Sequence, residues 1–395
     1  MNKENIKDNV AKYLMNTYKR YPLCFTRGDG VYLYDSSGKK YLDCISGIGV
    51  NALGYGNRQI TERMKTWGNK PLHTSNLFCI ESQVELAKIL IEESFPGKVF
   101  FANSGAEANE AAIKLARKFS LQKYGSENRH EIITMKNSFH GRTFATMSAT
   151  GQDKIKAGYS PLLPGFKHVD FNDGEGLLSA IDKNTCAVMV EAIQGEGGVV
   201  VANSDYIKEL RQICNEWGIL LIYDEVQTGV GRTGKMFAYS HFDAEPDIIA
   251  LAKGLGGGLP LGAIVAKDDV AAAFSPGDHA STFGGNPLSC ALGVEVLNQL
   301  RGGILENCKT MGVYFKEKLN GLMSKHKGIK QVRGLGLMLG VEFQDEATEI
   351  VNKCLNDGLL VNCTKGNVIR FLPPLIIKEE EIDEAMIIFE NHIFS

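Results

Sequence analysis

The chain has 395 residues, with 43 Lys and Arg against 46 Asp and Glu, a net charge of -3 and 44% hydrophobic residues. These values are typical of a folded globular protein; they exclude a disordered chain and a nucleic-acid surface built on excess positive charge. The length predicts two or three domains. Only glycine is unusual, at 43 of 395 residues against a usual share of about 7%, which predicts many tight turns or close approaches of backbone to a ligand.

Secretion, a membrane span and a metal site are not expected. The start is polar and mixed in charge, and the nine cysteines are scattered without C-x-x-C spacing, so we expect a cytoplasmic protein with reduced thiols. The eight histidines show no metal-ligand spacing. The apolar stretch 248–266 is long enough to span a bilayer, but its five glycines and Pro260 favour two core strands around a glycine turn.

Short apolar runs alternate with helix-period segments through the middle of the chain. Early strands are expected at 31–35 and 40–43. The expected order then is strand 99–102, helix 107–122, strands 131–135, 167–170 and 186–191, helix 206–217, and strands 219–223, 248–252 and 261–265. Apolar strands separated by amphipathic helices predict an α/β fold, with a mostly parallel sheet covered by helices on both faces. Ligands of such sheets bind beyond the carboxyl ends of the strands.

The last third changes character and predicts a small α+β domain. A helix is expected at 287–300, before this domain, and then helices at 304–324, 346–356 and 379–389 and strands at 331–334, 337–343, 359–361 and 368–371. We therefore expect three parts: residues 1–60, which pack with the small domain; the large domain, 61–300; and the C-terminal small domain, 301–395.

The segment from Gly229 to Lys235 matches two phosphate-loop patterns, G-x-G-x-x-G and G-x-x-x-x-G-K. Met236 stands where the second pattern needs a Ser or Thr to hold magnesium, and five residues separate the preceding strand from Gly229. A plain glycine turn is the favoured interpretation, with a nucleotide-binding protein as the alternative.

Two charged residues stand where apolar strands end. Lys253 follows the run 248–252, where burial favours a neutral amine able to attack a carbonyl; a lysine whose ammonium reaches water is the alternative. Asp224 follows the run 219–223 and could hold a protonated ring nitrogen, or simply cap the next segment. A lysine with such an acidic partner is the pair expected for pyridoxal phosphate.

Two further segments fit a bound phosphate and a bound ring. Ser104-Gly105-Ala106 lies between a strand and a helix, so its backbone N–H groups could bind a phosphate; an N-cap at Ser104 with Glu107 is compatible with this. In the segment 138–143, Phe139 offers a stacking face and Arg142 a guanidinium for a carboxylate.

With these residues in view, the chain resembles the class III pyridoxal-phosphate-dependent aminotransferases of fold type I almost from end to end. The motifs are R-G-D-G at 27–30, S-G-I-G-V-N-A-L-G at 46–54, H-T-S-N-L-F at 73–78, S-G-A-E-A at 104–108, F-H-G-R-T at 139–143, Q-G-E-G-G at 194–198, D-E-V-Q-T-G at 224–229, K-G at 253–254, S-T-F-G-G-N-P at 281–287 and R-F-L-P-P-L at 370–375. Within the family, the members that act on N2-acetyl-L-ornithine are those it resembles most.

The resemblance implies a role for each cofactor residue. Lys253 would form the Schiff base and move the proton, while Asp224 would keep the ring nitrogen protonated. Gln227 would bond the ring hydroxyl and Phe139 would stack on the ring. The remaining cofactor residues would be Ser104, Gly105, Ala106, Glu191, Val226 and Thr282. Because the hydroxyl of Thr282 would reach the phosphate from the partner subunit, the resemblance also implies an obligate homodimer.

The resemblance implies a substrate pair as well. Arg370 would bind the α-carboxylate of glutamate and Glu196 would mask it when the other substrate binds, while Arg142 and Ser281 would contact the acetylated substrate. The implied ping-pong reaction turns N2-acetyl-L-ornithine and 2-oxoglutarate into N-acetyl-L-glutamate 5-semialdehyde and L-glutamate, a step of arginine biosynthesis. Ornithine, succinylornithine, N-succinyl-diaminopimelate and 4-aminobutyrate remain alternative amino donors.

Overall fold

The computed structural model describes residues 3–393, and its largest element is a seven-stranded sheet of order β4-β12-β11-β10-β7-β5-β6. The strands are β4 Gly97–Ala102, β12 Gly262–Lys267, β11 Ile248–Leu251, β10 Leu220–Asp224, β7 Thr185–Val190, β5 Glu131–Met135 and β6 Phe166–Val169. Strand β12 is antiparallel to both its neighbours, whereas the other six run in one direction. The predicted α/β fold with a mostly parallel sheet is confirmed.

Alternate residues of each strand enter two different cores, one on each face of this sheet. In β10, Leu220 and Ile222 pack with alanines of α5, whereas Leu221 and Tyr223 join the core that contains α9 and α4. The helical elements of this part are α3 Arg58–Thr66, α4 Glu81–Glu93, α5 Gly105–Tyr124, α6 Phe144–Ala149, α7 Asp153–Lys156, α8 Gly174–Ala180, α9 Ser204–Trp217, η1 Ala238–His241, η2 Lys253–Gly256, α10 Asp268–Ala271 and α11 Pro287–Gln299. A short ribbon of β8 Ile193–Gln194 and β9 Val200–Val201 lies beside them. Both faces of the sheet are thus covered, as the continuous apolar strands predict.

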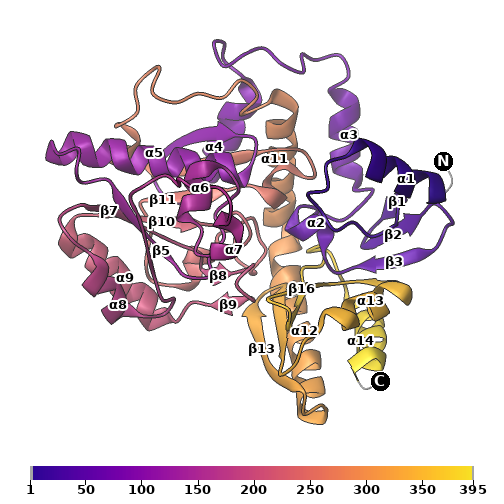
Figure 1. Cartoon of the computed structure of the whole chain (residues 1–395). Helices are drawn as coiled ribbons and strands as arrows, with labels where there is room; N and C mark the ends of the chain where they lie inside the picture. Colours follow the sequence, from indigo (N-terminus) through magenta and orange to yellow (C-terminus); the bar gives the residue numbers. More distant parts are fainter. Residues whose placement is uncertain (1–2, 394–395) are drawn as a thin grey trace.

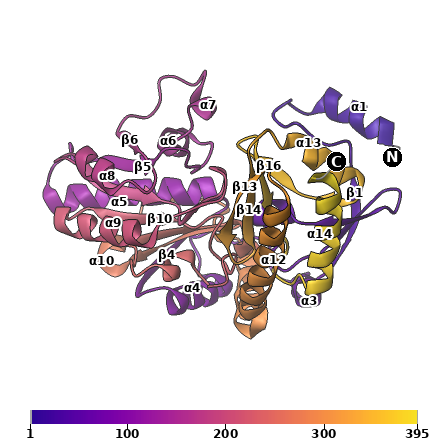
Figure 2. The same ribbon diagram turned by 90° about the horizontal axis from the view of Figure 1, so that it is seen from below.

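The two ends of the chain lie side by side, away from the large sheet (Figures 1 and 2). Two four-stranded sheets form here, β1-β2-β3-β15 and β13-β14-β17-β16, and β15 pairs in parallel with β3. The elements are α1 Lys3–Tyr13, β1 Phe25–Asp29, β2 Tyr32–Asp35, β3 Lys40–Asp43, α2 Ser46–Gly49, η3 Leu300–Ile304, α12 Leu305–Lys325, β13 Ile329–Leu335, β14 Met338–Phe343, α13 Thr348–Asn356, β15 Leu359–Leu360, β16 Asn362–Thr364, β17 Val368–Phe371 and α14 Glu379–Ile393. Within residues 3–393, no helix combines the length and apolar character needed to cross a membrane.

Most of the expected elements form within a few residues of their predicted bounds, and several others, such as α1, β1 and α8, form where none was predicted. The predicted strand 359–361 ends at Leu360, because the chain then crosses to the other small sheet, where β16 pairs with β17. The sequence pattern predicts no helix or strand between residues 61 and 98, yet α4 forms there and buries Leu86, Ile89 and Leu90. The domain borders near residues 60 and 300 stay a prediction.

The element α2 is a left-handed turn rather than an ordinary helix, since residues 46–49 all have positive φ. Such a conformation is costly for Ser46 and Ile48, which carry a Cβ. The carboxylate of Asp43 offsets the cost, because its Oδ1 accepts the N–H groups of Ile45 and Ser46 at 2.7 and 2.9 Å. The turn leads directly into Val50, which lines the cavity described next.

Candidate active site

Polar side chains from several strand ends line one cavity of about 490 Å³, a size suited to a small ligand. The strands concerned are β4, β5, β7, β10 and β11, whose carboxyl ends share one edge of the sheet. Of the predicted site residues, the lining contains Ser104, Gly105, Ala106, Phe139, Arg142, Glu191, Asp224, Val226, Gln227 and Lys253. The other four, Glu196, Ser281, Thr282 and Arg370, are outside this lining. The structure thus brings ten of the fourteen residues to one place.

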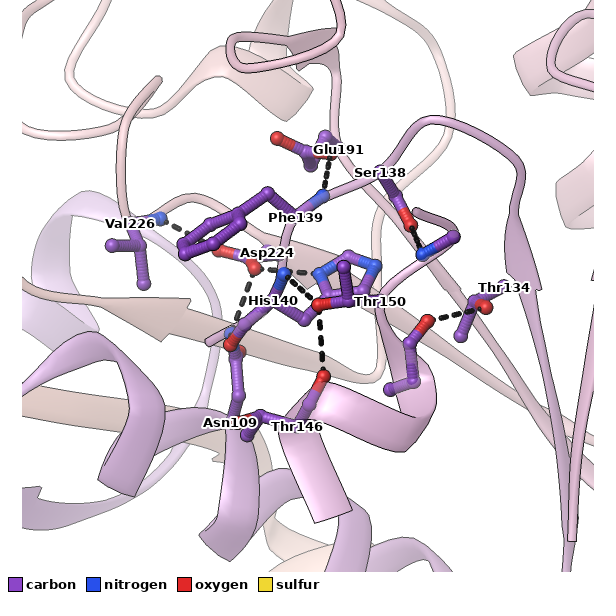
Figure 3. Close-up of polar contacts among 12 residues, drawn as sticks. Asn109, Thr134, Ser138, Phe139, His140, Thr146, Thr150, Glu191, Asp224 and Val226 are labelled. Carbon is purple, nitrogen blue, oxygen red and sulfur yellow. Dashed lines mark hydrogen bonds and ion pairs between the residues drawn. The ribbon is translucent and has the colours of Figure 1, made fainter. Parts of the chain in front are cut away.

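Asp224 lines the cavity and lies at the centre of a hydrogen-bond network (Figure 3). Its Oδ2 accepts from Asn109 Nδ2 and from His140 Nδ1, both at 2.7 Å, and its Oδ1 accepts from the N–H of Val226 at 3.0 Å. A carboxylate with three donors is held in one orientation. The side chain is only 4% exposed, so this orientation does not depend on solvent.

Asn109 and His140 were not among the predicted site residues. The amide of Asn109 gives one N–H to Asp224 and another to the carbonyl of His140 at 2.8 Å, so its nitrogen, and not its oxygen, must face both acceptors. His140 is fixed in turn, because its backbone N–H donates to Thr150 Oγ1 at 2.9 Å. One signal was available in the sequence: Asn109 is a polar residue on the alanine-rich face of α5.

Lys253 begins η2, two residues after β11, and has a left-handed backbone with φ 44°. Strain of this kind at a residue with a Cβ is typical of functional sites. Burial lowers the pKa of the Lys253 amine to about 8, even though the carboxylates of Glu196, Asp224 and Glu191 act in the opposite direction. A neutral amine is therefore accessible near neutral pH, as the apolar surroundings in the sequence predict.

The N-terminus of α5 contributes Ser104, Gly105 and Ala106 to the cavity lining. Ser104 is the N-cap, and its hydroxyl oxygen accepts the N–H of Glu107 at 3.2 Å, which confirms the capping interaction expected there. Gly105 begins the helix in close contact with Val226, since a Cβ at Gly105 would lie 2.6 Å from Val226 Cγ1. Free N–H groups and the helix dipole make this end suitable for a phosphate.

Glu191 and Phe139 form one side wall of the cavity. The carboxylate Oε2 of Glu191 accepts the backbone N–H of Phe139 at 3.1 Å, which fixes the aromatic ring beside the cavity. Burial and the nearby Asp224 carboxylate raise the pKa of Glu191 well above its ordinary value. Arg142 is at the solvent-exposed end of this wall, with its guanidinium 5.7 Å from the centre of the Phe139 ring.

Arg370 and Glu196 form an ion pair next to Gln227. Arg370 Nη1 donates to Glu196 Oε1 at 2.7 Å and to Gln227 Oε1 at 2.9 Å, and its Nε donates to Asn362 Oδ1 at 3.2 Å. The arginine side chain is 1% exposed and that of Glu196 is 33% exposed, so only the glutamate can swing toward solvent. Burial alone would raise the pKa of Glu196, but the charge and hydrogen bond of Arg370 hold it below its ordinary value.

Ser281 and Thr282 lie on a surface segment beside the cavity. Ser281 Oγ accepts from Asn103 Nδ2 at 3.1 Å, and Asn103 lines the cavity. Thr282 is exposed and does not reach this chain's own cavity. Its neighbour Phe283 is 61% exposed and contacts the ring of His73, with 5.4 Å between ring centres.

The glycine cluster 229–235 serves a structural purpose in this fold. Arg232, 2% exposed, extends from it and donates to the carbonyls of Leu337 at 3.1 Å and Pro373 at 2.6 Å, and to Ser46 Oγ at 3.5 Å. Gly231 and Gly234 have left-handed backbone, as a tight turn requires. The cluster therefore joins the large sheet to both ends of the chain, in agreement with the plain turn favoured over a phosphate loop.

The donor set of the cavity fits pyridoxal 5′-phosphate. A helix N-terminus suits its phosphate, the ring of Phe139 offers a stacking face, Asp224 offers a carboxylate for a protonated nitrogen, and Lys253 has an amine of lowered pKa. This arrangement at the strand ends of a mostly parallel sheet defines a fold type I pyridoxal-phosphate enzyme.

Comparison with known proteins gives the family. The family model described as aminotransferase class-III matches residues 13–393. The chain is 56% identical over 382 residues to the acetylornithine aminotransferase of Caldanaerobacter subterraneus subsp. tengcongensis, covering 96% of this chain and 97% of that one. It is 52% identical over 375 residues to the acetylornithine aminotransferase of Aquifex aeolicus, covering 95% and 98%.

A solved structure agrees with this result. The ornithine aminotransferase of Toxoplasma gondii, crystallised in the presence of oxidised glutathione and with pyridoxal phosphate at partial occupancy in its active site, superposes with a TM-score of 0.96 at 32% identity, covering 100% of this chain and 94% of that one. The chain belongs to the class III aminotransferases, which use pyridoxal 5′-phosphate.

Proposed function

We propose that this enzyme transfers the terminal amino group of N2-acetyl-L-ornithine to 2-oxoglutarate. The products are N-acetyl-L-glutamate 5-semialdehyde and L-glutamate. The observation that carries the proposal is the identity of 56% and 52%, over nearly the whole chain, to two acetylornithine aminotransferases. The scattered cysteines, all nine free in the structure, support a cytoplasmic location.

When bound, pyridoxal phosphate supplies the carbonyl that captures the amino group and the ring that accepts the electron pair. Asp224, fixed by Asn109 and His140, would keep the ring nitrogen protonated. Lys253 would hold the cofactor through its amine and would move the proton within the site, a task suited to an amine of pKa about 8. The N-terminus of α5 orients the phosphate.

The pair Arg370–Glu196 lets one cavity accept two substrates of different charge. With glutamate, Glu196 moves toward solvent and Arg370 takes a carboxylate of the substrate. With the acetylated amine, the ion pair stays closed, because a buried guanidinium without a partner would be costly. The exposure of the two side chains, 1% and 33%, supports this division of roles.

Arg142 and Ser281 complete the substrate site. Arg142 lies at the cavity's exposed end, where its guanidinium would bind the α-carboxylate of the acetylated amine or the side-chain carboxylate of glutamate. Ser281, held by Asn103, would contact the same substrate.

The enzyme acts as a homodimer, in which each subunit gives Thr282 to its partner's phosphate site. Thr282 is exposed beside a group of apolar side chains that a folded monomer would not leave in water. These are Leu72 at 62%, Leu77 at 89%, Phe78 at 69% and Phe283 at 61% exposed. Asn76 joins the two segments by donating to the carbonyls of Ser281 and Gly284, both at 3.0 Å.

The substrate is tested by kcat/KM for three amines, acetylornithine, ornithine and 4-aminobutyrate, each with 2-oxoglutarate as acceptor. We expect acetylornithine to have the highest value. A higher value for ornithine, the substrate named for the Toxoplasma relative, would overturn the substrate assignment while leaving the family intact.

The shared site is tested by mixing two inactive variants, Lys253→Ala and Thr282→Ala. A mixed dimer has one complete site if Thr282 crosses the interface, because the intact lysine and the intact threonine then meet. Activity should rise after subunit exchange. If a mixture shown to contain mixed dimers regains no activity, the proposal that Thr282 reaches the partner's site is contradicted.

A further inference from the structure

Outside the active site, Lys156 and His168 form a polar pair on the surface of the large sheet. Lys156 is the last residue of α7, and His168 is in β6, the edge strand. The amine Nζ of Lys156 lies 2.8 Å from Nε2 of His168. Figure 2 shows α7 within the long connection between α6 and β6, at the outside of the molecule. Both side chains are half-buried, so the pair is partly accessible to small molecules.

The hydrogen bonds around His168 determine its tautomer. Thr134 is fully buried, and its hydroxyl donates its single hydrogen to the carbonyl of Ala149 at 2.7 Å. The same oxygen lies 2.7 Å from Nδ1 of His168, so it must accept, and Nδ1 carries the imidazole hydrogen. The lone pair of Nε2 is then directed at Lys156.

Burial and the charge of Lys156 lower the pKa of His168 to about 4, with a smaller effect from His140. The imidazole is therefore neutral over the physiological range. Burial also lowers the pKa of Lys156, although the carboxylate of Asp153, on the same helix, opposes this. Lys156 thus has more neutral amine at neutral pH than an ordinary exposed lysine, and a proton acceptor is already in contact with it.

We propose that Lys156 is a preferred acceptor of activated acyl groups, such as acyl phosphates and acyl thioesters, with His168 as the proton acceptor. In this step the nitrogen lone pair of Lys156 attacks the acyl carbon. The bond from that carbon to the phosphate oxygen or thiol sulfur breaks, and the leaving group takes the bonding electrons. The proton released from nitrogen passes to Nε2 of His168 and then to solvent, and an amide remains on the lysine.

The chain supplies its own matched control. Lys154 is in the same short helix, two residues earlier, and is exposed. A single chymotryptic peptide that ends at Tyr159 contains both lysines. Differences in reagent, digestion and recovery therefore cancel when the two are compared.

The test exposes the holoenzyme to limiting acetyl phosphate, or in a second arm to acetyl-coenzyme A, at pH 7, and locates the acetyl group by tandem mass spectrometry. We expect Lys156 to be modified several-fold faster than Lys154, because its amine is held against the neutral Nε2 of His168 and Lys154 is exposed. In His168→Gln the preference should fall toward equality while the rate at Lys154 stays unchanged. Thr134→Val, which releases the tautomer of His168, should reduce the preference as well.

Each result decides the proposal. A preference for Lys156 with either reagent supports it, and the reagent that works identifies the class of donor. Equal or faster labelling of Lys154 in the wild type would overturn it, as would a preference that survives in both variants. Transaminase activity of the variants verifies folding, since neither residue lines the active-site cavity.

Discussion

Replacing Asn109 by leucine keeps a side chain of similar size and removes both of its donors. The carboxylate of Asp224 loses one of its three hydrogen bonds, and the carbonyl of His140 loses another. A hydrogen bond to a charged group is worth about 2 kcal/mol. If that energy serves to orient Asp224 toward the cofactor, the dissociation constant for pyridoxal phosphate should rise by up to roughly 30-fold.

The assay is a titration of apoprotein with pyridoxal phosphate, followed by visible absorbance, alongside thermal unfolding of the apoprotein. Asn109→Asp should be worse than Asn109→Leu, because a second carboxylate would then face Asp224. Glu110→Gln, one residue further along α5, is the matched control, since its carboxylate accepts from Thr143 and Ala145 instead. Unchanged cofactor affinity in Asn109→Leu, with only a lower melting temperature, would refute a positioning role.

Three further predictions concern charges in or near the site. Glu196→Gln removes the carboxylate that masks Arg370, so the KM for glutamate should fall, while kcat/KM for the acetylated amine should also fall. Steady-state kinetics with each substrate measure this. An equal change in kcat/KM for glutamate and for the acetylated amine would contradict the masking role. Because the Lys253 amine has a pKa of about 8 and must be neutral to react, the rate of cofactor capture by apoprotein should rise with pH and level off above that value; stopped-flow absorbance that shows a flat profile from pH 6 to 9 would exclude a lowered pKa. Arg232→Met leaves the carbonyls of Leu337 and Pro373 without their donor, so the unfolding free energy should drop by about 3 kcal/mol, measured by urea denaturation of holoenzyme; a loss below about 1 kcal/mol would mean that water replaces the guanidinium.

The local sequence pattern was sufficient to predict much of the fold and the placement of Asp224 and Lys253. The apolar runs before Asp224 and Lys253 predicted strands, and a parallel sheet brings the ends of its strands to one edge. Both side chains accordingly line the same cavity. The prediction of a phosphate site at Gly105 rests on a strand that meets a helix at small residues, which is also a local signal.

Contacts between distant segments could not be predicted in this way. Arg232 contacts Ser46, Leu337 and Pro373, which are 186, 105 and 141 residues away in the chain, and no periodicity encodes such partners. Asn109 likewise reaches Asp224 across 115 residues. These residues become visible only when the fold places buried donors opposite buried acceptors.

Two glycine-containing segments also show that local sequence alone does not identify a binding site. Gly229 to Lys235 carries the strongest local resemblance to a phosphate loop, yet its backbone makes a tight turn that positions Arg232. Gly105 carries no recognised phosphate motif, yet it lines the cavity at a helix N-terminus. Position in the cavity lining, and not the motif itself, separates the two.

We expect Lys253 to be the residue that binds the cofactor covalently. Reduction of the purified holoenzyme with borohydride, followed by peptide mass spectrometry, tests it most directly. We predict one reduced pyridoxyl-phosphate adduct, on the peptide that contains Lys253, and none in Lys253→Ala supplied with the same cofactor. An adduct on another lysine in the wild type, or no adduct at all, would contradict the covalent role of Lys253.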